Sequence, residues 1–175
     1  MLFILTGVSG TGKTTLLECL RDELPESSYF LADIDQEGVP SGVDEEWRKR
    51  QAARWHAEAV SRSPHGSSVV LSGTVLPTDL PRDADLTVRV CLLSATPEAI
   101  TSRLRSRYSK LASASELERV VGQTVESFIA QTVRDQPGFE RCFAQSSFRY
   151  SVVDTSSISV GEACGRVLSL IRETA

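Results

Sequence analysis

The chain has 175 residues, of which 41% are hydrophobic and 24% charged, a size and composition that suit one domain with a sizeable core. Its formal net charge of −4 argues against a general binder of nucleic acids or anionic membranes, because an acidic surface repels both. Since no run approaches the roughly 18 apolar residues of a membrane helix, we expect neither a membrane nor a nucleic acid as partner.

Apolar runs alternate with helical patterns along the chain, which is typical of βα units on a parallel sheet. Thr96 is positioned to cap one helix, and Ser159 forms a capping box with Glu162 at another. We predict one α/β domain over 1–175, with a five-stranded parallel sheet flanked by helices. Strands are expected near 2–6, 29–33, 68–72, 86–93 and 148–153, and helices near 13–24, 44–61, 96–107, 115–133 and 159–173.

The first loop, GVSGTGKTT at 7–15, lies between an expected strand and an expected helix and matches the pattern GxxxxGK[ST]. Its glycines let successive N–H groups form an anion nest, and the helix N-terminus adds partial positive charge. Lys13 then suits the β- and γ-phosphates of a nucleoside triphosphate, and the Thr14 hydroxyl suits Mg²⁺. The alternative, a glycine-rich turn without a ligand, is disfavoured by this context. The expected nucleotide-binding residues of the loop are Gly7, Ser9, Gly10, Thr11, Gly12, Lys13, Thr14 and Thr15.

Two acids follow the second expected strand in YFLADIDQEGVP. Asp33 and Asp35 are two positions apart, so in an extended chain both carboxylates project from the same face. One acid would hold Mg²⁺ through water, while the other would orient or deprotonate an attacking hydroxyl. The alternative is a solvated acidic turn.

These segments resemble the small P-loop kinases of metabolites, especially shikimate kinase and gluconate kinase. GVSGTGKTT is similar to the gluconate-kinase loop, and DIDQEG resembles the DxD segment of shikimate kinase. The resemblance implies a P-loop NTPase fold with ATP and Mg²⁺ as cofactors. It also implies that Asp33 is the magnesium acid and Asp35 the base.

The resemblance extends to three later segments. VVLSGTV (69–75) is similar to the segment that borders the acceptor pocket, which implies substrate-binding roles for Gly73 and Thr74. SVVDTSSISVGEA resembles the last strand and adenine-side loop, which implies that Asp154, Thr155 and Ser156 border the base.

RLRSR (103–107) resembles the lid arginines of the same kinases, within a lid over about 103–118. The resemblance implies that Arg103 stacks on the base and that Arg107 clamps the transferring phosphoryl group, with Arg105 as a rival. The alternative is a cation cluster favoured by the C-terminal end of a helix. The chain also departs from these families, because RYSKLASASE replaces the shikimate-kinase lid motif RPLL.

An acceptor-binding region is expected over about 36–66. On a helical wheel of 44–60, Arg48 and Trp55 fall nearly in line, and Arg54 lies in a neighbouring row. Arginine beside tryptophan suits a ring or sugar with a polar or anionic handle. The alternative is an amphipathic helix with core tryptophans and solvated arginines.

The four cysteines form no CxxC pair, and Cys91 lies in an apolar run typical of a core residue. The apolar run at 2–5 suits a core strand better than a signal peptide. We therefore expect reduced thiols and a cytoplasmic protein.

Together the patterns predict an ATP- and Mg²⁺-dependent phosphotransferase that acts on a hydroxyl of a small molecule, such as a metabolite, sugar, nucleoside or antibiotic. We expect a monomer or homodimer. One alternative is a nucleoside monophosphate kinase, whose acceptor is a phosphate. Another is a non-kinase P-loop ATPase or switch protein, although the strand ending in Asp-Glu and the NKxD signature typical of that class are missing.

Overall fold

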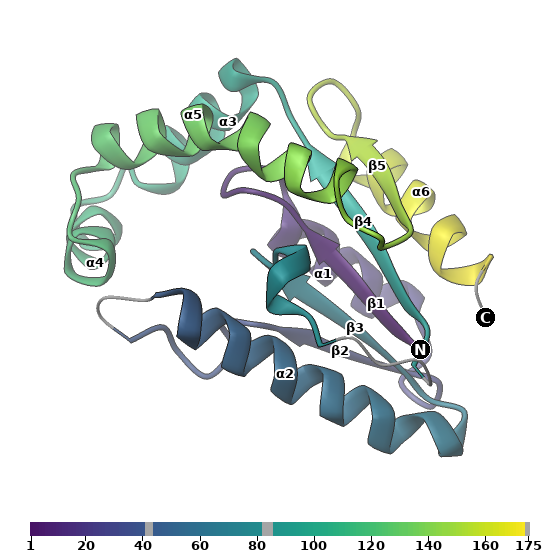
Figure 1. Cartoon of the computed structure of the whole chain (residues 1–175). Helices are drawn as coiled ribbons and strands as arrows, with labels where there is room; N and C mark the ends of the chain where they lie inside the picture. The colour runs from purple at the N-terminus through teal and green to yellow at the C-terminus, as the bar shows by residue number, and fades with distance from the viewer. Residues whose placement is uncertain (41–43, 82–85, 174–175) are drawn as a thin grey trace.

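A five-stranded parallel sheet forms the centre of the computed structural model, which describes residues 1–40, 44–81 and 86–173 (Figure 1). Each expected strand is present, with ends shifted by two residues at most, and the predicted fold class is confirmed. The spatial order is β2-β3-β1-β4-β5, and every neighbouring pair is parallel. The strands are β1 (Leu2–Thr6), β2 (Tyr29–Asp33), β3 (Ser68–Gly73), β4 (Val88–Ser94) and β5 (Tyr150–Asp154).

Helices connect the strands and begin where the capping residues are expected. The Thr96 side chain accepts a hydrogen bond from the Ala99 N–H (3.3 Å), and Ser159 and Glu162 form the capping box. Residues 41–43, within the expected acceptor region, lie outside the described residues. The helices are α1 (Lys13–Glu23), α2 (Glu45–Arg62), α3 (Pro97–Arg107), α4 (Leu111–Val121), α5 (Val125–Ala144) and α6 (Val160–Arg172), with 3-10 turns η1 (Ser63–His65) and η2 (Pro77–Asp79).

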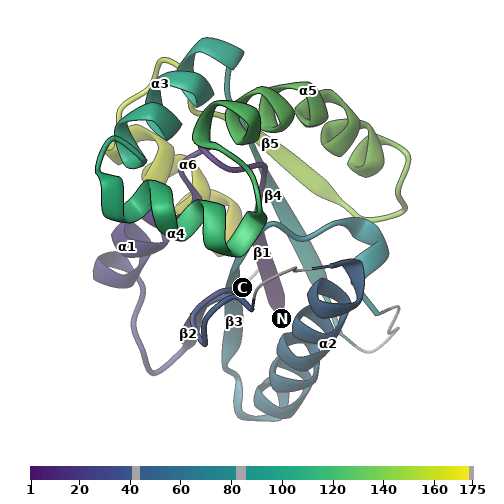
Figure 2. The same cartoon turned by 90° about the vertical axis from the view of Figure 1, so that its left-hand side faces the viewer.

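The two faces of the sheet are covered by different helices, as Figures 1 and 2 show. Along the central strand β1, Leu2 and Ile4 pack in a cluster with α2 and α5, whereas Phe3 and Leu5 pack in a cluster with α1 and α6. This division follows from the two-residue period of a strand. All of β1 is therefore buried, which explains the uninterrupted apolar run at 2–5.

One predicted helix is wrong. Residues 115–133 belong to two helices, because Gly122 ends α4 with a left-handed backbone (φ 72°) and Thr124 caps α5 through the Ser127 N–H. Helix α5 then continues through Pro137 to Ala144. Its apolar side chains, Ile129 and Phe143 among them, are buried in the core clusters, and this packing outweighs the hydrogen bond that proline removes.

The expectation that all four thiols are reduced is also wrong for one pair. Cys19 of α1 and Cys164 of α6 form a disulfide, with Cα atoms 6.4 Å apart. Cys91 is a buried core residue, as predicted, and burial raises the pKa of its thiol to about 12. Cys142 is exposed and unbonded.

The sheet register brings the expected site segments to one edge. Thr6 pairs with Gly73, and Asp33 pairs with Ser72, so the loop after β1 begins beside the ends of β2 and β3. Figure 2 views the molecule from the side that carries α4 and the beginning of α2. Ligands of open α/β sheets bind at the carboxyl ends of the strands, where the order reverses.

Within the described residues, no helix has both the length and the apolar character needed to cross a lipid bilayer.

Candidate active site

The loop between β1 and α1 has the tight backbone of a phosphate-binding loop. Gly10 and Gly12 adopt left-handed conformations, with φ values of 83° and 95°. A Cβ atom on Gly7 would lie 2.5 Å from the carbonyl oxygen of Leu93, so only glycine fits there. The loop runs directly into the N-terminus of α1, whose N–H groups and dipole favour an anion.

Lys13, the first residue of α1, folds back over this loop. Its Nζ donates hydrogen bonds to the carbonyl oxygens of Gly7 (2.8 Å) and Val8 (2.9 Å). Burial of the ammonium lowers the pKa of Lys13 to about 8, against the opposing effect of the Asp35 and Asp33 carboxylates. The positive charge is therefore held between the loop and the acids.

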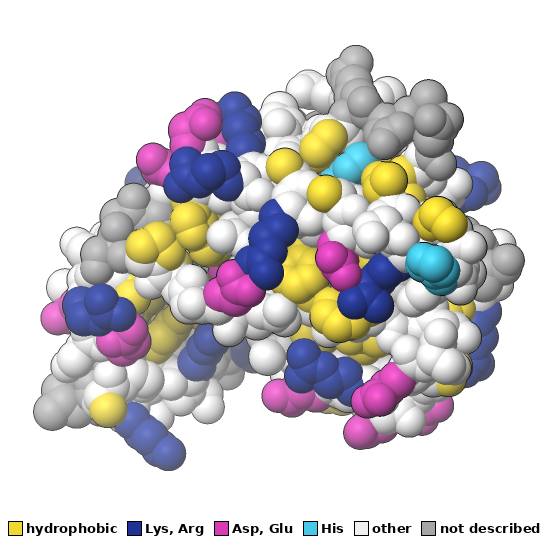
Figure 3. Space-filling model, turned by 90° about the horizontal axis from the view of Figure 1, so that it is seen from below, with side chains coloured by type: hydrophobic (Ala, Val, Ile, Leu, Met, Phe, Trp, Pro, Cys, Tyr) yellow, Lys and Arg dark blue, Asp and Glu magenta, His cyan; other side chains and the backbone are white. Residues whose placement is uncertain are grey.

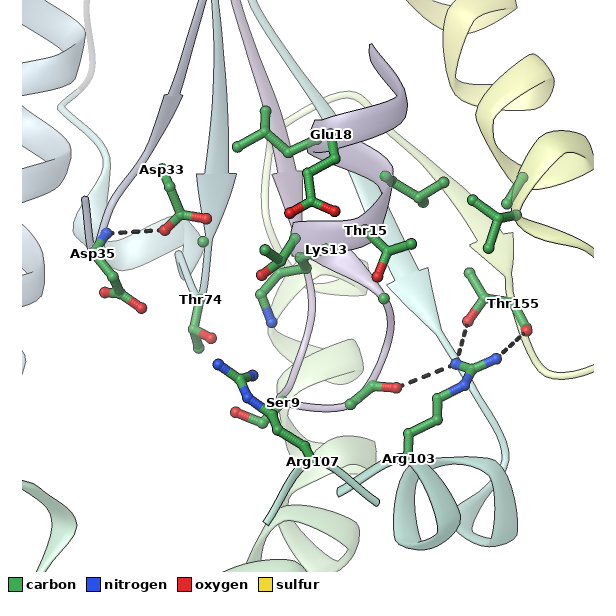
Figure 4. Close-up of a pocket in the computed structure, with 18 of the residues that line it drawn as sticks. Ser9, Lys13, Thr15, Glu18, Asp33, Asp35, Thr74, Arg103, Arg107 and Thr155 are labelled. Atoms are coloured by element: carbon green, nitrogen blue, oxygen red, sulfur yellow. Dashed lines mark hydrogen bonds between the residues drawn. The ribbon is translucent and has the colours of Figure 1, made fainter. Parts of the chain in front are cut away.

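A cavity of about 730 Å³ opens around the loop, and Figure 4 shows the side chains that line it. Most of the residues expected from the sequence line it. They come from the phosphate-binding loop, α1, the ends of β2 and β3, α3 and the β5–α6 loop. Gly7 and Thr11 belong to the loop but are not in the cavity wall. The expected residues that line it are Ser9, Gly10, Gly12, Lys13, Thr14, Thr15, Asp33, Asp35, Gly73, Thr74, Arg103, Arg107 and Thr155.

Asp33 is the last residue of β2, and Asp35 lies on the short turn that follows. The Asp35 N–H donates to Asp33 Oδ1 (3.0 Å), which fixes the Asp33 carboxylate on the turn. Asp35 is exposed as a residue, but the cavity shields its carboxyl, and this burial raises its pKa. Asp33 raises that pKa further, while Lys13 and Arg107 lower it. The turn therefore supplies one anchored carboxylate and one that faces the cations.

The three arginines of α3 separate into two groups. Arg103 and Arg107 line the cavity, and Arg107 is close enough to Lys13 and Asp35 to affect the pKa of each. Arg105 lies outside the cavity and forms an ion pair with Glu126 of α5 (2.9 Å). In this structure, Arg107 and not Arg105 is placed toward the cavity.

The loop after β5 forms the opposite wall. Thr155 lies in this wall, but Asp154 does not, and this is a correction. Asp154 Oδ1 instead accepts hydrogen bonds from the N–H (2.8 Å) and hydroxyl (2.5 Å) of Ser156, which lower the pKa of Asp154. The neighbouring wall, which surrounds the start of α6, was not expected from the sequence. It consists of the capping residue Ser159 and the apolar residues Ile158, Val160 and Ala163.

Helix α1 contributes more of the wall than expected. Glu18 and Arg21 line the cavity beyond Thr14 and Thr15. Glu18 follows Thr14 by four positions, so helical periodicity alone places it on the same face and was a usable signal. Gln36 of the acid turn was also missed.

None of the described residues that line the cavity comes from α2, which corrects the expectation for Arg48, Arg54 and Trp55. Trp55 is 4% exposed and packs in the core, with its ring 6.0 Å from that of Phe30. For Trp55, the alternative interpretation is therefore correct, in which α2 is an amphipathic helix with its tryptophan in the core.

The two arginines of α2 are engaged by acids. Arg48 Nε pairs with the buried carboxylate of Asp79 (3.3 Å). Arg54 forms a two-bond ion pair with Glu37. The surface seen from below in Figure 3 accordingly shows basic and acidic side chains next to each other.

Comparison with known proteins identifies the family. Residues 4–121 match the profile of a family described as AAA domain. The bifunctional ribose 1,5-bisphosphokinase–thymidine phosphorylase of Roseobacter denitrificans is 30% identical over 148 residues, which cover 71% of this chain but 22% of the relative. The chain thus spans about a fifth of that protein.

Solved kinases share the fold at low sequence identity. Shikimate kinase from Acinetobacter baumannii, in complex with shikimate, gives a TM-score of 0.59 at 17% identity, covering 98% of this chain and 93% of its own. Deoxyadenosine kinase from M. mycoides gives 0.57 at 12%, covering both chains fully (100%). Thymidylate kinase from Candida albicans gives 0.56 at 10%, covering 98% and 91%.

The family match extends from β1 through α4 and covers more than half of the chain, while the solved structures share its sheet and helices. The chain therefore belongs to the AAA domain family and has the P-loop fold of small-molecule and nucleoside monophosphate kinases.

Proposed function

We propose that this protein is an ATP- and Mg²⁺-dependent phosphotransferase that transfers the γ-phosphoryl group to a hydroxyl of a small molecule. The observation that carries the proposal is a cavity lined by Asp35 together with two cations, Lys13 and Arg107, which are close enough to lower the pKa of Asp35. A carboxylate beside an acceptor and cations around a transferring phosphoryl group are the two parts that this reaction needs.

The nucleotide would bind along the phosphate-binding loop. Backbone N–H groups at the start of α1 and the Lys13 ammonium suit a triphosphate. Its negative charge attracts the ammonium more strongly than the two carbonyl oxygens to which Lys13 donates in this structure. The apolar residues Ile158, Val160 and Ala163 offer a flat wall for the base. The kinases of the same fold, among them a deoxyadenosine kinase with bound dATP, support a nucleotide as donor.

Mg²⁺ fits the oxygen donors of the cavity. Thr14 is exposed at the start of α1, and Asp33 uses one carboxylate oxygen on the Asp35 N–H, which leaves the other for the metal or its water. These hard ligands, few in number, are typical of magnesium bound together with phosphates. When bound, the ion would neutralise charge on the β- and γ-phosphates.

Asp35 would act on the acceptor. Its carboxylate takes the hydroxyl proton as the acceptor oxygen bonds to the γ-phosphorus, and ADP leaves with the electrons of the broken P–O bond. Lys13 and Arg107 would neutralise the equatorial oxygens during transfer. Gly73 and Thr74, at the end of β3, would border the acceptor.

A phosphate acceptor is the second candidate, in which case the enzyme would resemble a nucleoside monophosphate kinase. The specific observation in its favour is the 30% identity to a protein named for a ribose 1,5-bisphosphokinase. An acceptor that is already anionic needs arginines more than a base. Arg107 would then bind the acceptor, and Asp35 would contribute little.

The test is a phosphoryl-transfer screen with Mg²⁺–ATP, in which mass spectrometry detects the added phosphate on sugars, nucleosides, antibiotics and ribose 1,5-bisphosphate. With a hydroxyl acceptor, Asp35→Asn is expected to reduce transfer by roughly 10²–10⁴ while ATP affinity stays within a few-fold. Glu37→Gln, on the same turn but outside the cavity wall, is the matched control and should retain transfer.

Three results would change the proposal. Normal transfer with poor ATP binding in Asp35→Asn would assign Asp35 to the metal. Transfer to phosphorylated acceptors alone, at a rate unaffected by Asp35→Asn, would support the second candidate. ATP hydrolysis without transfer to any acceptor would contradict both.

A further inference from the structure

Arg103 is bound to the protein at three points, although a resemblance to kinases implies that it stacks on the base. Its Nη1 donates to the carbonyl oxygen of Gly10 (3.2 Å) and to the Thr155 hydroxyl (3.0 Å). Its Nη2 donates to the Thr155 carbonyl oxygen (2.6 Å). One guanidinium thus links α3, the phosphate-binding loop and the loop after β5, as the dashed lines in Figure 4 show.

Thr155 continues this link to a second point on the phosphate-binding loop. It is buried, and its hydroxyl accepts from Arg103. The single proton of this hydroxyl is within hydrogen-bond distance of two carbonyl oxygens, those of Thr11 (3.0 Å) and Ser94 (3.1 Å). The Thr155 N–H donates to the carbonyl oxygen of Ser94, which fixes the loop after β5 to β4 (2.9 Å). The Thr155 side chain is therefore held from both sides rather than turned to solvent.

The two carbonyl groups that receive these bonds belong to the phosphate-binding loop itself. In a planar trans peptide, the carbonyl and the N–H point in opposite directions. Holding the Thr11 carbonyl toward Thr155 therefore turns the Gly12 N–H away from Thr155. The Thr11 N–H, which shares a peptide with the Gly10 carbonyl, donates to the Val8 carbonyl oxygen inside the loop (3.4 Å). Orientation of these peptides decides how well the loop holds an anion.

We propose that Arg103 is a positioning residue, which acts through Thr155 to set the peptide planes of the phosphate-binding loop before the nucleotide binds. This inference rests on the proposed nucleotide binding. In it, Arg103 contributes to the affinity for the phosphates of the nucleotide rather than for its base. The network of Gly10, Thr11, Arg103 and Thr155 is named here the loop tether.

The experiment measures binding of Mg²⁺–ATP by calorimetry, and of Mg²⁺–tripolyphosphate by displacement of ATP, since tripolyphosphate has no base. Arg103→Gln and Thr155→Val are each expected to weaken both ligands about ten-fold, the scale of a hydrogen bond to a charged group. The double variant should be weaker than either single variant by no more than about two-fold, because both changes break one tether.

Thr155→Ser keeps the hydroxyl and should restore binding to near the wild-type level. Arg105→Gln, on the opposite side of α3, is the control for loss of an arginine and should bind as the wild type does. Circular dichroism and melting temperature establish that each variant is folded. If Thr155 contributed only to stability, Thr155→Ser would not be expected to restore the binding of both ligands.

Four outcomes would overturn the loop tether. These are losses confined to ATP, additive losses in the double variant, equal weakening by Thr155→Ser and Thr155→Val, or failure of tripolyphosphate to displace ATP from the wild type. Failure of the wild type to bind ATP at all is a different result, since it would remove the proposed function as well.

Discussion

Loss of the Cys19–Cys164 disulfide is expected to lower the free energy of unfolding by roughly 2–5 kcal/mol. The two cysteines are separated by 145 residues, so the bond closes nearly the whole chain into one loop. Loop-closure entropy for that length gives about 5 kcal/mol at 25 °C, and native disulfides commonly deliver somewhat less. For a chain of this size, the loss corresponds to a fall in Tm of roughly 5–20 °C.

The assay is urea unfolding followed by circular dichroism, with and without a phosphine reductant. Cys19→Ser should reproduce the effect of reduction, whereas Cys142→Ser is the matched control, because Cys142 is exposed and unbonded. A thiol titration of the denatured, unreduced protein should count only Cys91 and Cys142. Detection of all four thiols, or equal unfolding midpoints for Cys19→Ser and the wild type, would refute the reasoning.

Three further predictions concern the cavity and its neighbours. Lys13→Ala should lower kcat by on the order of 10²–10³ through loss of a preorganised cation, and near-normal turnover in steady-state kinetics would contradict its role. The profile of kcat/KM for ATP should fall as pH rises through about 8, where Lys13 loses its proton, and fall at acid pH as Asp35, with its raised pKa, becomes protonated. A profile that is flat from about pH 5 to 9 would contradict both assignments. Trp55→Ala should reduce stability by about 3–5 kcal/mol by opening a core cavity. A large change in acceptor KM without this loss would instead return Trp55 to the acceptor site.

The parts of the fold that local physics decides were predictable from the sequence. The run at 2–5 specifies a strand buried on both faces, and the glycines and Lys13 that follow specify a strand-to-helix loop for an anion. Thr96 and Ser159 mark helix starts because a side-chain oxygen there satisfies an N–H that the helix itself leaves unpaired.

The remaining features depend on distant contacts that no local pattern contains. Pro137 predicts the end of a helix, yet α5 continues because packing of Phe143 against the sheet outweighs the missing hydrogen bond. Nothing in the spacing of the cysteines points to Cys164 as the partner of Cys19. Only the packing of α1 beside α6 on one face of the sheet brings them together.

Helix α2 shows that local sequence patterns are also insufficient for predicting functional residues. A helical wheel states which residues share a face, but not whether that face meets the core or a cavity. Trp55 proves to be a core residue because α2 lies across the sheet, and Arg54 is engaged by Glu37 on the acid turn. The cavity is instead lined at the ends of β2 and β3, where Asp35 and Thr74 form the acceptor side that we propose.

Helical periodicity does separate the arginines of α3, and the separation has a consequence for the reaction. Arg103 and Arg107 are four positions apart and share the cavity face, whereas Arg105 lies on the far side and pairs with Glu126. Arg103 is held by the loop tether, so its charge is fixed near the phosphate-binding loop. Arg107 is in the last turn of α3, with its guanidinium 5.6 Å from the ring centroid of Tyr108, just before α4 begins. We therefore propose that Arg107, which the loop tether does not hold, is the arginine of α3 that contacts the transferring phosphoryl group.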